Sequence, residues 1–206
     1  MKAKYHREIT QHALGQFLQT DVLETVIVAN LGQDALRYQF GHDHFHYDSS
    51  FFGEGDAYCD EQRRIVVAEM KIAQTHLARQ AFGRLAHTVQ DFYAHSNYVS
   101  LWREFYPDVS PWEIDPEQDD ILRSSRLHSG KLYYPFELLS FVEGLREYVL
   151  PFLPRDSHAW MNKDIPSRLY FDVAFAAAVK RTNLEFQRIC GRLSSSEVVL
   201  FTGKES

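Results

Sequence analysis

Hydrophobic residues recur along this chain at helical spacing, and polar stretches separate the helical patterns. Val and Ile fall mostly within that spacing, and no series of alternating strands is visible. The longest pattern contains no proline, and Pro107 and Pro111 follow its end. We expect an all-α protein with helices at residues 8–17, 22–28, 61 to about 105, 135–150 and 166–193.

Three stretches rich in glycine, proline or polar residues interrupt these patterns, at about 40–60, 106–126 and 151–166. A chain of 206 residues with a hydrophobic fraction of 45% is long enough to bury one ordinary core. We therefore expect a single helical domain over residues 1–206, with irregular loops at the three stretches.

Charge and composition argue against several classes of partner. The formal net charge is −6, and the Lys and Arg residues are scattered, so neither a duplex nucleic acid nor an anionic membrane is expected to bind. No apolar run approaches the roughly 20 residues needed to cross a bilayer, and the first residues lack the apolar core of a secretory signal. We expect no transmembrane segment and a cytoplasmic location, with specialised export as the alternative.

Candidate chemistry begins with a run of three polar side chains. His87, Asp91 and His95 are spaced four residues apart, and each such step turns only about 40° around a helix, so they share one face. Imidazole and carboxylate suit Zn²⁺ and similar ions. Cys59 and Cys190 form no CxxC pair, so a metal would be held by His, Asp or Glu. The alternative is a set of hydrogen-bonded core histidines.

A second cluster lies in the loop GHDHFHYD. It places His42, Asp43, His44, His46 and Asp48 within seven residues, a density typical of metal-binding tracts. Alternation of polar and aromatic residues predicts an extended segment in which the even-numbered positions face one side. A solvated polar loop is the alternative.

Four further residues are single candidates: His6, Asp34, His158 and Asp164. His6 lies near the start of the first helix, and Asp34 lies near the end of the second. His158 opens a loop in which Asp164 could cap the next helix. Each position has an ordinary structural interpretation when it is taken alone.

Taken in chain order, these pieces resemble the zinc-dependent phospholipase C and single-strand nuclease superfamily, and most closely its Het-C-like branch. The resemblance covers most of the chain, and GRLAHTVQDFYAHSNYV at 83–99 is its most specific part. The other segments that carry it are HREITQHAL at 6–14, ANLGQD at 29–34, HYDSSFF at 46–52, LHSG at 127–130 and SHAWMNKD at 157–164.

The resemblance implies a helical domain with two or three zinc ions in a cleft. It implies one ion at Asp34, His46, His87 and Asp91, with His44 as the alternative to His46. A second ion would bind His6 and Asp91, which would bridge the two. A third would bind His95 and His158, with Asp164 as a further ligand.

The activity that the resemblance implies is a zinc-dependent phosphoesterase, in which a metal-activated water attacks a phosphoester, with a phospholipid as one candidate substrate. Asp34 or Asp91 would orient or deprotonate this water. The alternatives are a single-strand nuclease and a non-catalytic, metal-stabilised Het-C-like interaction or toxin-associated module.

Overall fold

The computed structural model describes residues 1–35, 41–142 and 144–204, and in this part of the chain it is helical with no β-sheet. The prediction of an all-α protein is confirmed. The longer helices are α1 (Ala3–Leu14), α2 (Thr20–Leu31), α3 (Phe52–Lys71), α4 (Thr75–His95), α5 (Tyr98–Phe105), α9 (Phe171–Cys190) and α10 (Ser195–Thr202). Shorter turns are η1 (Gly32–Asp34), η3 (Asp43–Phe45), η4 (Asp48–Ser50), η5 (Pro111–Glu113), α6 (Asp119–Leu122), η6 (Phe136–Phe141), α7 (Arg146–Val149), η7 (Leu150–Phe152) and α8 (His158–Met161).

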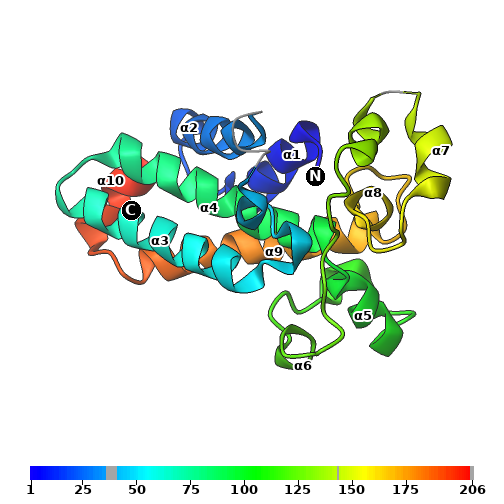
Figure 1. Cartoon of the computed structure of the whole chain (residues 1–206). Coiled ribbons are helices and arrows are strands. Elements are labelled where there is room, and N and C mark those ends of the chain that lie inside the picture. Colours follow the sequence, from blue (N-terminus) through cyan, green and yellow to red (C-terminus); the bar gives the residue numbers. More distant parts are fainter. Residues whose placement is uncertain (36–40, 143, 205–206) are drawn as a thin grey trace.

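Helix α4 is the central element of the bundle. It runs through the middle of Figure 1 and contacts α2, α3 and α9. Every residue from Leu85 to His95 is buried, so both its apolar and its polar faces lie inside the protein. A helix that is buried on all sides belongs to the interior of a domain. The polar face of α4 must therefore find its partners within the fold.

Gly83 allows α2 to approach α4 closely. A Cβ atom at this position would lie 2.4 Å from the carbonyl oxygen of Val26 and 2.7 Å from the Cβ of Ala29. Only glycine leaves room for such a contact between backbones. The close approach carries the end of α2, and η1 behind it, toward the polar face of α4.

The long helical run predicted over 61–105 is three helices. Helix α3 ends where Ala73 adopts a left-handed conformation with φ of 56°, and the backbone N–H of Gln74 donates to the carbonyl of Glu69. Helix α4 ends at His95, and the backbone of the next residue, Ser96, is extended. Neither break uses the glycine or proline that usually marks a helix end, so the sequence pattern concealed both.

Other boundaries also differ from the prediction. Helix α3 begins at Phe52, inside the stretch expected to be irregular. The helix expected at 135–150 is instead the 3₁₀ turn η6 and the single turn α7. Helix α9 begins at Phe171 rather than near 166, and α10 was not predicted. Within the described ranges, no helix combines the length and apolar character that crossing a bilayer requires.

Candidate metal centre

The polar face of α4 is the floor of a buried cluster of histidines and aspartates. One oxygen of Asp91, Oδ2, lies 3.0 Å from Nε2 of His87, and the other, Oδ1, lies 3.8 Å from Nε2 of His95. Segments remote in sequence add to this face. His6 comes from α1, Asp34 from η1, and His46 from the residue after η3.

The first potential metal group consists of Asp34, His46, His87 and Asp91. Nδ1 of His46 lies 2.9 Å from Oδ2 of Asp91 and 3.1 Å from Nε2 of His87, which is 3.7 Å from Oδ1 of Asp34. A tetrahedral ion with bonds of about 2.0–2.1 Å spaces its ligand atoms about 3.4 Å apart. These three separations lie on either side of that spacing, so the four side chains could hold such an ion.

The second potential group consists of Asp48, His95 and His158. Oδ1 of Asp48 lies 3.2 Å from Nδ1 of His95 and 4.0 Å from Nε2 of His158. The backbone N–H of His158 donates to the carbonyl of Lys131, which fixes the start of α8 beside the cluster. All three side chains are buried, so their polar atoms need partners inside the protein.

Two candidates from the sequence lie near these groups without belonging to either. Nε2 of His6 is 3.2 Å from Oδ1 of Asp91, and Oδ1 of Asp164 is 3.5 Å from Nε2 of His95. The α-amino group of Met1 lies between them, 2.6 Å from Oδ1 of Asp91 and 3.3 Å from Oδ1 of Asp164.

The loop at 42–48 is not the extended segment that its alternation predicted. It folds into the turns η3 and η4, and Tyr47 takes a left-handed conformation with φ of 54°. The turns bring His46 and Asp48 into the cluster, one into each group. His44 instead packs its ring against Phe45, and it belongs to neither group. Asp48 was not among the ligands predicted from the sequence, although its position in the His-rich loop indicated a possible metal ligand.

Behind the two groups, a network of side-chain amides and hydroxyls determines which ring nitrogens of His6 and His87 carry a proton. The hydroxyls of Thr10 and Thr182 donate to backbone carbonyls of their own helices, so both accept hydrogen bonds from Nε2 of Gln90. Oε1 of Gln90 is therefore the acceptor for Nδ1 of His6 at 2.7 Å and for Nδ2 of Asn30 at 3.2 Å. The amide of Asn30 is oriented in turn, and its Oδ1 accepts from Nδ1 of His87.

This network settles which nitrogen of His87 faces the cluster. Burial lowers the pKa of His87 to about 4, so the ring is neutral near pH 7 and carries its single proton on Nδ1. Its Nε2 lone pair then points at the carboxylate of Asp91. A second hydrogen bond that fixes a histidine in this way is typical of metal-binding histidines.

The remaining pKa shifts reflect the concentration of charge. Burial lowers the pKa of His95, but the carboxylates of Asp91 and Asp48 outweigh burial and raise it to about 10. Burial would raise the pKa of Asp91, yet the charges of the Met1 amino group and of His95 hold it well below its usual range. Burial lowers the pKa of His46, but the hydrogen bond to Asp91 together with the charges of Asp91 and Asp48 outweighs burial and raises it. The positive charge of His95 thus balances part of the carboxylate charge.

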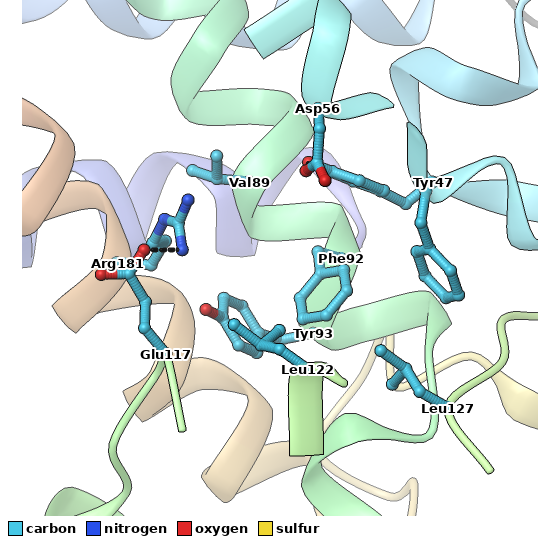
Figure 2. Close-up of a pocket in the computed structure, with 10 residues that line it drawn as sticks. Tyr47, Asp56, Val89, Phe92, Tyr93, Glu117, Leu122, Leu127 and Arg181 are labelled. Carbon is cyan, nitrogen blue, oxygen red and sulfur yellow. Dashed lines mark hydrogen bonds and ion pairs between the residues drawn. The ribbon is translucent and has the colours of Figure 1, made fainter. Parts of the chain in front are cut away.

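A separate pocket of about 270 Å³ lies beside other residues of α4, including Val89, Phe92 and Tyr93 (Figure 2). Its charged and hydroxyl groups are already paired, since Arg181 binds Glu117 and the hydroxyl of Tyr47 donates to Asp56. Aromatic rings and leucines form much of the remaining wall.

Fold and site together define an all-α domain whose buried His/Asp groups could bind metal ions. Residues 4–110, just over half of the chain, match the family of the VWA7 N-terminal domain, and the chain belongs to this family. The matched residues contain the whole first group but not His158 of the second.

Two relatives carry the same name. Von Willebrand factor A domain-containing protein 7 of Homo sapiens is 37% identical to this chain over 73 residues, and the protein of that name in Rattus norvegicus is 33% identical over 73 residues. Each alignment covers 35% of this chain and 8% of the relative, so the chain matches only a small part of these proteins. No solved structure matches the chain.

These matches correct the family expected from the sequence. The chain belongs to the VWA7 N-terminal family, so the prediction of a zinc-dependent phospholipase C or single-strand nuclease, with its Het-C-like branch, is wrong. The phosphoesterase function inferred from that resemblance, and its two alternatives, are wrong with it. The resemblance rested on short His/Asp motifs, and such motifs satisfy the geometry of a metal ion on any helical scaffold.

Proposed function

We propose that this domain binds two divalent transition-metal ions, zinc foremost, one in each His/Asp group. The orientation of His87 carries the proposal. Its Nε2 lone pair lies 3.0 Å from a carboxylate oxygen of Asp91 inside the protein, and two electron-rich atoms at this distance need a cation or a proton between them.

The donor set favours zinc and chemically similar ions. Imidazole nitrogens with carboxylate oxygens suit Zn²⁺, whereas Ca²⁺ and Mg²⁺ prefer oxygen ligands alone. Among the described residues, neither cysteine belongs to a group, so no thiolate competes for the ion.

Metal ions here would hold the fold together. The first group joins η1, the loop at His46 and α4, and the second joins the same loop to α4 and α8. Ions that bind the folded chain more tightly than the unfolded chain stabilise it in proportion to their affinity. We therefore expect zinc to raise the thermal unfolding temperature of the domain.

The test is metal analysis of zinc-loaded, desalted protein, in which we expect two zinc ions per chain. Asp48→Asn is expected to retain one ion, because Asp48 belongs only to the second group. Asp120→Asn, an exposed aspartate outside both groups, is the matched control and is expected to retain two. A folded wild-type protein that retains no zinc would overturn the proposal.

Metal binding is expected to release protons and to strengthen as pH rises. The pKa of His95 is raised to about 10, so this ring must lose a proton before it binds an ion, and the raised pKa of His46 strengthens the competition from protons at the first group. Each displaced proton makes the affinity rise about tenfold per pH unit between pH 6 and 8. Calorimetric titration of zinc in two buffers of different ionisation enthalpy measures this release.

In the metal-free protein, the raised pKa of His95 makes the stability of the fold decrease as pH rises. A raised pKa means that the contribution of His95 to stability is fully present below its ordinary pKa of about 6.5 and is lost as pH rises toward 10.

A zinc affinity that does not change with pH would show that neither His46 nor His95 is a ligand.

A further inference from the structure

A pocket of about 410 Å³ is lined by three cationic side chains, Arg155, Lys163 and Arg168, together with His128. Its described lining contains no carboxylate, although the chain as a whole has a formal net charge of −6. None of the described residues of the two metal groups lines it either. The pocket is therefore a concentration of positive charge that is separate from the candidate metal centre.

Lys163 is the buried cation of this pocket, with 5% of its surface exposed. Its ammonium group donates to the carbonyl of Ser96 at 2.7 Å and to that of Met161 at 3.1 Å. An ammonium has three donors, so one is left for a further acceptor. In the described part of the chain, no carboxylate forms an ion pair with Lys163, and the carboxylate of the next residue, Asp164, lies beside His95 instead.

The two arginines are held in place by neutral partners. Nε and Nη2 of Arg168 donate to Oδ1 of Asn162, each at 3.3 Å, and Nη2 also donates to the carbonyl of Ala159. The guanidinium of Arg155 stacks 3.8 Å from the centre of the Trp160 ring. These contacts use part of each guanidinium and neutralise none of its charge, which leaves Nη1 of Arg168 to bind an anion.

We propose that this pocket binds a small molecule bearing a phosphate group or a comparable oxyanion. Arginine forks match the oxygen geometry of phosphate and carboxylate groups, and a buried lysine adds a point charge. Asn97, Ser100 and Ser167 add neutral polar groups to the wall. A volume of about 410 Å³ lies within the range of small-molecule sites, so the oxyanion can carry an organic substituent.

Titration with inorganic phosphate, by calorimetry at constant ionic strength, tests this proposal. Protein stripped of metal and freed of chelator is used, since phosphate could also bind a metal ion. We expect saturable binding of one phosphate per chain in the millimolar range or tighter. Succinate and glucose 6-phosphate are the parallel probes, and weaker binding of succinate would indicate a preference for phosphate over carboxylate.

Arg155→Gln is the first variant, because Arg155 is exposed and its described contact is with Trp160 alone. We expect it to weaken phosphate binding several-fold, and Arg155→Gln with Arg168→Gln to weaken it tenfold or more. Arg192→Gln, an exposed arginine outside the pocket, is the matched control and is expected to bind as the wild type. Absence of saturable binding to the wild type, or equal binding by the folded Arg155→Gln variant and the control, would overturn the proposal. Neither result depends on whether the His/Asp groups bind metal.

Discussion

Asp91→Asn is expected to abolish metal binding at the first group and to lower the free energy of unfolding of the metal-free protein by about 3–5 kcal/mol. The carboxylate of Asp91 is 1% exposed and lies within 3.2 Å of Nδ1 of His46, Nε2 of His6 and the Met1 amino group. An uncharged amide neither replaces this charge nor satisfies the buried amino group and imidazoles left behind. Their unpaired burial is the main cause of the expected loss.

Urea unfolding of metal-free protein measures this loss, and zinc titration measures the binding. Asp21→Asn, an exposed residue of α2, is the control and is expected to change stability by less than about 0.5 kcal/mol. Because the pKa of Asp91 is depressed, its contribution is present above the ordinary aspartate pKa of about 3.9 and is lost as pH falls further. The difference between wild type and variant should therefore shrink in acid. Full zinc binding by Asp91→Asn would contradict the assignment of Asp91 to the first group.

Glu185→Gln is expected to destabilise the domain by about 3–5 kcal/mol without changing its metal content. Glu185 is fully buried in α9, where Arg63 donates to it through Nε and Nη2 at 2.7 and 2.8 Å. Arg181 and Arg188 each donate to the same carboxylate at 2.9 Å. Burial would raise the pKa of Glu185, but the hydrogen bonds from Arg63 and the charge of Arg181 lower it.

Chemical unfolding monitored by circular dichroism measures this effect. Glu61→Gln is the matched control, because Glu61 pairs with Arg64 on the surface of α3, where an ion pair contributes at most about 1 kcal/mol. The depressed pKa of Glu185 means that its stabilisation is lost as pH falls below the usual glutamate range. Equal stability of the two variants would show that the buried network contributes no more than an exposed pair.

The helical character of the chain was predictable because the periodicity of apolar residues directly reports burial on one face of a helix. Breaks were less predictable where no glycine or proline marks them, as at Ala73 and Ser96. The polar face of α4 is buried against polar side chains of other elements, which the periodicity alone could not show. The sequence pattern of a polar helix face is the same whether water or buried side chains satisfy its hydrogen bonds.

The candidate site was predictable in part for a similar reason. Four-residue spacing placed His87 and Asp91 together, whereas Asp34 and His46, which spacing alone could not connect to them, were expected there only from the resemblance. Sequence spacing could not choose between His44 and His46, since this depends on the left-handed turn at Tyr47. Asp48 was not selected, because no pattern in the sequence connects it to His95 or to the histidine of α8.

Gln90 has a consequence for how the bundle finds a single arrangement. Helices held only by apolar contacts can shift along one another by a turn and bury nearly the same area. The side chain of Gln90 on α4 forms hydrogen bonds with Thr10 of α1, Asn30 of α2 and Thr182 of α9. A shift by one turn would therefore leave a buried amide without hydrogen-bond partners. Four helices are thereby locked in one axial alignment. This alignment holds His6 and His87 beside the carboxylate of Asp91 in the absence of a metal ion.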